Sequence, residues 1–475
     1  MLKIKRKLIK KKVLFCAAEA VPLAKVGGLA DVVGSLPVAL RSQKIDARIL
    51  MPAHSLISLR ALGAKKLTSF VVKVGSKREI VSLYQARVQG TTYYLLQNKN
   101  YFKGEVYSGN SGPKYLFFCR AALISLTHLS FSPDIIHAHD FHAAPILTEL
   151  SRRPRRQRPG LVLTIHNLQH QGWIEASQIT TFGFNLEDFP LLAKSKEDNS
   201  WLNLLAAGIA CADKVTTVSP NYAREILTPA YGQGLESLLF SRRRDLVGIL
   251  NGINVDSYNP IKDDNLALNF NDKNLAKGKF LHKEAICSYL HLENASAPLL
   301  VFIARFSWQK GLDLFTVESL QSLAKKYPFH LVLLGSGEEK YESLALHLEQ
   351  SLSTTVRTLI AFDEVLARNL YAAADYFLVP SQFEPCGLTQ MIAMRYGAVP
   401  IVRATGGLKD TVVDGSTGLV FKDYSPVALA ATLEKALRLY YRDYKKYQGL
   451  QTQGRRQDWS WRASAPTYRR LYDSV

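Results

Sequence analysis

Short runs of consecutive apolar residues recur along the chain, and a polar or glycine-containing loop follows most of them. One series lies at residues 13–17, 47–51, 135–136, 161–165, 214–218 and 246–250, and a second at 299–303, 331–334, 358–361, 376–379 and 399–402. Continuous apolar strands are typical of parallel sheets covered by helices on both faces. Between them, helices are predicted over residues 31–40, 118–126, 143–150 and 388–396. The pattern predicts an α/β fold with two sheets.

Three stretches depart from this alternation. Residues 68–74, 79–88 and 91–96 are predicted to form antiparallel strands, and residues 202–212 a buried helix too short to cross a membrane. The polar stretch 262–279 is predicted to be a linker or hinge between two domains. The aromatic and basic segment 438–475 is predicted to form a closing helix that packs against both domains.

The formal charge of +20 raises the question of an anionic partner. Its clusters at residues 3–12, 152–158 and 242–244 contain no alternating aromatic residues, and no nucleic-acid motif is present. We therefore interpret them as solvated loops and expect neither a nucleic-acid nor a membrane partner. The five cysteines form no CxxC pair, and no apolar signal core follows the basic start, so we expect a cytoplasmic protein.

Polar side chains cluster where the first series of strands ends. Lys25, Gly27 and Gly28 follow the first strand and precede a helix, an arrangement suited to an anion. Residues 137–142 (HAHDFH) place Asp140 after a strand, and His166 ends the next strand. The histidines invite a metal interpretation, but their spacing matches no zinc motif. Residues at strand ends more often line a ligand cleft.

The second series carries a similar pattern. Arg305 and Lys310 lie in one loop after a strand, close enough in sequence to reach one diphosphate. Glu384 is a lone carboxylate in the loop before the predicted helix, where it can hold a sugar hydroxyl, and Gly406 and Gly407 form the next turn. Taken alone, Arg305 and Lys310 read as two solvated cations. Together with Glu384 and the glycine turn, they suggest a nucleotide-sugar site.

The chain resembles the bacterial glycogen synthases and plant starch synthases. The resemblance rests on an ordered set of motifs: KVGGL at 25–29, HAHDFH at 137–142, TIHN at 164–167, GILNG at 248–252, ARFSWQKG at 304–311, PSQFEPCGLTQ at 380–390 and RATGGLKDTV at 403–412. It implies the GT-B architecture of two Rossmann-like domains facing a cleft. Residues 1–260 would form the acceptor domain and 261–456 the donor domain, with a C-terminal helix at 457–475 packing back on the first. It also implies retaining transfer of glucose from ADP-glucose to the 4-hydroxyl of an α-1,4-glucan, without a metal or other cofactor.

Roles for particular residues follow from the same resemblance. Arg305 and Lys310 would neutralise the diphosphate, Glu384 would hold the ribose, and N–H groups at Leu388 and Thr389, with the turn at Gly406 and Gly407, would bind phosphate. His166 would position the transferred glucose, beside Asp140 and Asn251. Lys25, Gly27 and Gly28 would approach the phosphates, while Tyr101 and Asp31 would contact the acceptor.

Some positions depart from the family pattern. Phe141 stands where tryptophan is usual, and Ile392 stands where many GT-B enzymes have a second glutamate. A retaining glycosidase needs two nearby carboxylates. No obvious second carboxylate is found, which favours front-face displacement assisted by the leaving phosphate. The sequence leaves open UDP-glucose as donor, a silent glucan-binding scaffold, and a monomeric or homo-oligomeric state.

Overall fold

The computed structural model describes residues 11–107, 111–190 and 200–475 and divides into two compact units. The first comprises Met1–Gly252 and Trp461–Val475, and the second Ile253–Ser460. The first boundary lies eight residues before the predicted 260/261, and the second lies four residues after the predicted 456/457. Most of the basic stretch at 3–12 lies outside the described residues. No helix in the described ranges combines the length and apolarity needed to cross a membrane.

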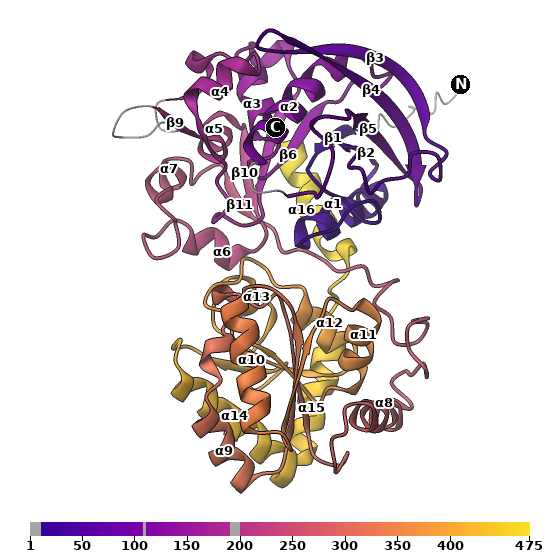
Figure 1. Cartoon of the computed structure of the whole chain (residues 1–475), viewed down its shortest axis with the longest axis vertical. Helices are drawn as coiled ribbons and strands as arrows, with labels where there is room; N and C mark the ends of the chain where they lie inside the picture. The colour runs from indigo at the N-terminus through magenta and orange to yellow at the C-terminus, as the bar shows by residue number, and fades with distance from the viewer. Residues whose placement is uncertain (1–10, 108–110, 191–199) are drawn as a thin grey trace, which may run out of the picture. The chain divides into compact units, whose positions relative to one another are not determined.

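The first unit is built on a nine-stranded sheet in the order β11-β10-β7-β6-β1-β2-β5-β4-β3 (Figure 1). Its strands are β1 Lys11–Cys16, β2 Ile45–Pro52, β3 Lys65–Val74, β4 Lys77–Val88, β5 Thr91–Gln97, β6 Ile135–His139, β7 Gly160–Ile165, β10 Lys214–Thr217 and β11 Leu246–Gly248. The helices are α1 Gly28–Leu40, α2 Ser111–Ser125, α3 Ala144–Ser151, α4 Ala176–Thr181, α5 Leu204–Cys211, α6 Pro220–Glu225, α7 Glu236–Ser241 and α16 Trp461–Asp473. A separate hairpin pairs β8 Trp173–Glu175 with β9 Trp201–Asn203.

The three strands predicted to be antiparallel are only partly so. β4 is antiparallel to both β3 and β5, but β5 is parallel to β2 and joins the main sheet. Thr91–Gln97 is largely buried, as a strand inside a sheet must be, whereas β3 alternates between exposed and buried positions along much of its length. The predicted buried helix at 202–212 is also shorter, because β9 takes its first residues and α5 begins at Leu204.

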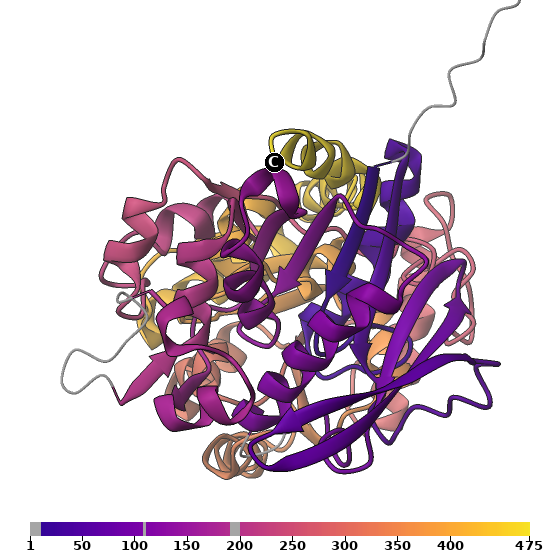
Figure 2. The ribbon, with the colours of Figure 1, turned by 90° about the horizontal axis from the view of Figure 1, so that it is seen from above.

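The last helix completes the core of the first unit. Along α16, Trp461, Tyr468 and Tyr472 are buried in the same cluster as α1 and β1. Figures 1 and 2 show this yellow helix near the indigo start of the chain. Tyr472 also hydrogen-bonds a ring nitrogen of His137 on β6, at 2.8 Å. The predicted single closing helix is corrected to separate helices, of which α15 lies in the second unit and α16 in the first.

The second unit has a six-stranded, wholly parallel sheet in the order β14-β13-β12-β15-β16-β17. Its strands are β12 Leu299–Ile303, β13 His330–Gly335, β14 Val356–Ile360, β15 Tyr376–Val379, β16 Val399–Arg403 and β17 Leu419–Phe421. The helices are α8 Leu275–Tyr289, α9 Val317–Lys326, α10 Glu339–Ser351, α11 Glu364–Ala373, α12 Thr389–Arg395, α13 Gly406–Thr411, α14 Pro426–Arg442 and α15 Tyr444–Arg455. Figure 1 shows helices on both faces of this sheet.

The prediction of a flexible linker at 262–279 is wrong. Asp263 is buried and pairs with the buried Arg368 at 3.1 Å. Lys279 lies within α8 and donates to the carbonyls of Ala372 and Tyr396, at 2.9 and 3.2 Å. The whole stretch belongs to the second unit, and the distant partners of Asp263 and Lys279 leave no local signal in a sequence whose other polar residues are mostly exposed.

Candidate active site

The loop after β1 is held by a buried carboxylate. Glu19, only 1% exposed, accepts hydrogen bonds from the backbone N–H groups of Val26 (2.5 Å) and Gly27 (3.4 Å) and from the Tyr107 hydroxyl (3.0 Å). Burial raises its pKa to about 7, although the three hydrogen bonds oppose this. The loop presents Lys25, whose ammonium lies 2.9 Å from a carboxylate oxygen of Asp31.

The two glycines of this loop lie at the start of α1. Gly27 has φ −143°, a conformation open to any residue, and Gly28 begins α1. A Cβ on Gly27 would meet only Glu19, at the ordinary distance of 3.8 Å. Neither the backbone conformation nor the packing of the described residues therefore requires glycine at Gly27, and its expected role beside a phosphate stays a prediction.

Asp140 and His166 meet at the ends of β6 and β7. Asp140 has φ +54° and accepts a 2.7 Å hydrogen bond from the His166 backbone N–H, and the Asn167 N–H also donates to it. Burial, with a smaller contribution from the nearby Glu19 carboxylate, raises the pKa of Asp140 to about 8, although the two backbone hydrogen bonds oppose this. Buried His166 has its pKa lowered to about 3 by desolvation, so its imidazole is neutral. Its Nε2 lies 2.9 Å from His139 Nδ1, while Nδ1 has no hydrogen-bond partner in the described part of the chain.

The other histidines of the HAHDFH motif are internal. His137 lies between the Tyr472 hydroxyl and the Thr164 hydroxyl, at 2.8 and 2.6 Å, and His139 stacks on it with ring centroids 4.4 Å apart. Within the residues described, no group of three or more His, Cys, Asp or Glu side chains could hold a metal ion. The buried rings of His137 and His139 therefore pack inside the first unit, next to the strand ends that carry Asp140 and His166.

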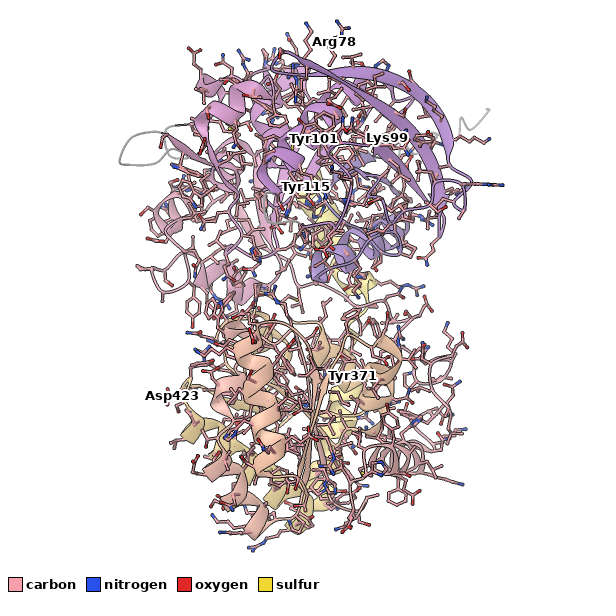
Figure 3. All side chains as sticks on the ribbon, viewed as in Figure 1. Arg78, Lys99, Tyr101, Tyr115, Tyr371 and Asp423 are labelled. Atoms are coloured by element: carbon pink, nitrogen blue, oxygen red, sulfur yellow. The ribbon has the colours of Figure 1, made fainter. Side chains whose placement is uncertain are left out.

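Asn251 and Tyr101 belong to the first unit, and within the described chain no side-chain hydrogen bond joins either of them to Asp140 or His166. Asn251 is 5% exposed, and its side-chain oxygen has no partner among the described residues, which marks it as a candidate ligand contact. Figure 3 labels Tyr101 in the first unit. One face of the Tyr101 ring stacks on Phe117, with centroids 4.0 Å apart, and Phe182 packs edge-on at 5.8 Å. Only its remaining surface is left for a sugar.

In the second unit, Lys310 and Glu384 form an ion pair of 2.7 Å. The Lys310 turn is tied to the Glu384 loop by two hydrogen bonds, from Gln309 Nε2 to the Phe383 carbonyl (3.1 Å) and from the Gln382 N–H to the Gln309 carbonyl (2.8 Å). Glu384 Oε2 accepts both the lysine and the Ser381 hydroxyl, at 3.0 Å. No hydrogen bond of Oε1 is found within the described ranges, so this oxygen can receive a ligand hydroxyl.

The glycine turn after β16 packs directly on the Glu384 loop. The Gly407 N–H donates to the Glu384 carbonyl at 3.0 Å. Gly406 has φ +44°, and a Cβ there would lie 1.8 Å from that same carbonyl oxygen, so only glycine fits. On the other side, Leu388 precedes α12, which begins at Thr389 without a side-chain cap. The structure thus brings Lys310, Glu384, Gly406 and Gly407 together.

Arg305 is the residue of the predicted diphosphate site that lies apart from the Lys310–Glu384 pair. Its side chain is exposed in the loop after β12, and no hydrogen bond or ion pair of the guanidinium is found within the described chain. The preceding strand places the backbone of Arg305 at the carboxyl edge of the sheet, as expected, but among the described residues no hydrogen bond or ion pair joins its side chain to the Lys310–Glu384 pair.

Comparison with known proteins covers nearly the whole chain. The family model of the starch synthase catalytic domain matches residues 12–241, and that of glycosyl transferases group 1 matches 291–457. A glycogen synthase of Anoxybacillus flavithermus is 38% identical over 98% of both chains. The chain belongs to the glycogen and starch synthase family.

The solved structures agree with this assignment. The catalytic domain of starch synthase IV from Arabidopsis thaliana, bound to ADP and acarbose, has a TM-score of 0.89, with 32% identity and 98% coverage of each chain. A sucrose-phosphate synthase from Thermosynechococcus elongatus, 18% identical with a TM-score of 0.61, covering 98% of this chain and all of that one, shares the fold alone. The predicted family, the GT-B class and the glycosyltransferase activity are confirmed.

Two residues that hold the loop after β1 were not predicted from the sequence. Glu19 and Tyr107 hold the Lys25 loop, but 88 positions separate them in sequence. The one available signal was a lone carboxylate directly after a buried strand, the same signal that singled out Asp140.

Proposed function

We propose that the protein transfers glucose from ADP-glucose to the non-reducing-end 4-hydroxyl of an α-1,4-glucan, with retention of configuration. The bond from glucose C1 to the phosphate oxygen breaks, a bond from C1 to the acceptor oxygen forms on the same face, and ADP departs with the acceptor proton on its phosphate. The observation that carries the proposal is the Lys310–Glu384 pair, held 2.7 Å apart in a loop cluster where only glycine fits at position 406.

The second unit is proposed to bind the nucleotide. Lys310 has three donors and spends one on Glu384, which leaves two for diphosphate oxygens. The free Oε1 of Glu384 accepts a ribose hydroxyl. Arg305, which has no described partner to give up, supplies a second cation once a diphosphate is bound. Charge grows on the diphosphate as it leaves, so fixed cations stabilise the transition state more than the ground state, and the scheme includes no metal.

The first unit is proposed to hold the glucose and the acceptor. His166 is neutral, so its free Nδ1 hydrogen-bonds a sugar hydroxyl without adding charge. The orphaned side-chain oxygen of Asn251 is available to another hydroxyl. Lys25 and Asp31, paired at 2.9 Å, are proposed to contact phosphate and acceptor respectively. We also propose a cytoplasmic location, where the five free cysteines would stay reduced.

The test is incorporation of labelled glucose into glycogen from ADP-glucose and, in parallel, from UDP-glucose. Lys310→Ala removes the proposed diphosphate cation, and Lys326→Ala is the matched control, because Lys326 also pairs with a glutamate, Glu434, at 3.1 Å but on an exposed surface. We expect transfer from ADP-glucose, lowered about 10²- to 10³-fold by Lys310→Ala and unchanged by Lys326→Ala.

Each other outcome has a defined meaning. A preference for UDP-glucose would retain the mechanism and change the donor. No transfer from either donor by a folded protein that still binds glycogen would replace the enzyme with a glucan-binding scaffold. Equal effects of the two lysine variants would remove the diphosphate role of Lys310.

A further inference from the structure

Two half-exposed tryptophans lie on one face of the β8–β9 hairpin in the first unit. Trp173 is 51% exposed and Trp201 44%. In the register, Trp173 faces Asn203 and Glu175 faces Trp201, so both indoles and the Glu175 side chain point to the same face. The buried Ile174 and Leu202 occupy the other face. Diagonal positions of this kind lie about 7–8 Å apart.

The hairpin is fixed to the loop that begins at His166. Asn203 Nδ2 donates to Gln171 Oε1 at 2.6 Å. Gly172, with φ +66°, packs so closely on Phe141 that a Cβ would lie 2.3 Å from the ring. Trp173 follows directly, seven residues after His166. The two indoles are therefore held by a rigid support that continues from the proposed sugar-binding residue.

The charge of the sequence around Trp173 favours a neutral occupant over an anionic one. In a chain of formal charge +20, residues 159–190 contain no lysine or arginine. Glu175, Glu187 and Asp188 are the charged residues of this stretch. The stretch 159–190 thus offers a nucleic acid or an anionic lipid surface no lysine or arginine of its own, and Arg152, which reaches Asp188 at 2.9 Å, is already paired. The faces of exposed indoles instead suit the apolar faces of pyranose rings, and the Glu175 carboxylate can accept their hydroxyls.

We propose that the surface formed by Trp173, Glu175 and Trp201 binds a chain of α-1,4-glucan, as a second glucan site in addition to the residues that take part in transfer. The choice of α-glucan as the carbohydrate rests on the proposed function. Two indoles at diagonal spacing contact separate glucose residues of one chain. Holding the polymer in this way raises the local concentration of chain ends, because each later encounter becomes intramolecular.

The experiment measures glycogen binding without donor, by retardation of the whole protein in native gels that contain glycogen. The test variant carries Trp173→Ala and Trp201→Ala. Phe362→Ala is the control, because Phe362 is an 85% exposed aromatic side chain of the second unit. A variant with phenylalanine at both tryptophan positions keeps a stacking face. Transfer from ADP-glucose to glycogen and to maltotriose is measured on the same proteins.

We expect the double alanine variant to bind glycogen at least about tenfold more weakly, with most of the binding kept by the phenylalanine variant and all of it by the control. Its KM for glycogen rises, while kcat and the KM for maltotriose stay unchanged. Wild-type retardation of the double alanine variant overturns the proposal. So does an equal loss with maltotriose, which would mean that the hairpin acts through the His166 loop. A changed oligomeric state with unchanged glycogen binding would assign the surface to a second copy of the chain. If neither the wild type nor any variant transfers glucose, the proposed function fails, and the retardation of the variants in glycogen gels still tests the glucan surface.

Discussion

Replacing Glu19 by glutamine tests whether a buried carboxylate holds the Lys25 loop. The carboxylate accepts two backbone N–H groups and the Tyr107 hydroxyl. An amide keeps one acceptor oxygen and turns the other position into a donor, so at least one buried donor loses its partner, at about 1–3 kcal/mol. The loop that carries Lys25 loosens, and we expect kcat/KM to fall about ten- to hundredfold.

The pH dependence gives the sharper result. Burial raises the pKa of Glu19 from 4.5 to about 7, and this difference corresponds to about 3 kcal/mol. Because the folded-state pKa is the higher one, the carboxyl's contribution to stability is fully present below pH 4.5 and is lost as the pH rises through 7. Glutamine does not ionise. The free energy of unfolding of Glu19→Gln should therefore gain about 3 kcal/mol relative to wild type between pH 4.5 and 8.

Urea unfolding at several pH values, read beside transfer assays, measures both effects. Glu79→Gln is the matched control, since Glu79 also accepts two N–H donors, from the side chains of Asn98 and Asn100, at 3.1 and 2.8 Å. A constant stability difference between wild type and Glu19→Gln across the pH range would refute the burial argument. Wild-type transfer kinetics in Glu19→Gln would refute the loop-holding role.

Two further substitutions test the rest of the site. Gly406→Ala forces a Cβ against the Glu384 carbonyl, so we expect the free energy of unfolding, measured by thermal unfolding, to fall by about 2–5 kcal/mol and glucose transfer to be lost. Gly415→Ala is the control, because Gly415 has φ +70° with nothing within 4 Å, and it should lower the free energy of unfolding by only about 1–2 kcal/mol. Equal losses in the two variants would contradict the packing argument. Asp140→Asn keeps a residue that tolerates φ +54°. Because the pKa of Asp140 is raised from 3.8 to about 8, wild type loses stability as the pH rises from about 4 to 8, so the free energy of unfolding of Asp140→Asn should rise relative to wild type over that window and level off above pH 8 in urea titrations. A difference that stays constant between pH 4 and 8 would be the contrary result.

Local patterns were sufficient to predict most of the fold. Strands such as β12 and β15 are apolar throughout because both faces of a parallel sheet are covered, and this leaves a continuous signal in the sequence. Lys310, Glu384 and His166 could also be predicted as site residues from the sequence, because each follows a continuous apolar strand. The predictions that were wrong concern residues whose partners are distant in sequence. Asp263 seemed to belong to a linker because its ion-pair partner, Arg368, lies 105 residues away.

The site residues show the same limit. No local feature indicates that Glu19 accepts a hydrogen bond from Tyr107. Nor does any indicate that Lys310 is paired while the Arg305 guanidinium has no partner among the residues that the structure describes. The sequence also could not show that Trp173 and Trp201, separated by 28 positions, share one face of a hairpin. Residue types and strand ends are local properties, whereas hydrogen-bond partners and shared surfaces require the folded backbone.

The membership of α16 in the first unit has a consequence for synthesis on the ribosome. Residues 1–252 emerge first, but the aromatic side chains of Trp461, Tyr468 and Tyr472 that fill their core follow only after the whole of Ile253–Ser460 has been made. At about 5–20 residues per second, those roughly two hundred residues take about 10 to 40 s. Throughout that interval the nascent first unit exposes an apolar groove where α16 belongs. Nascent chains of this protein should accordingly depend on chaperones that cover such grooves, and a circular permutant that places α16 ahead of β1 should be released from that dependence.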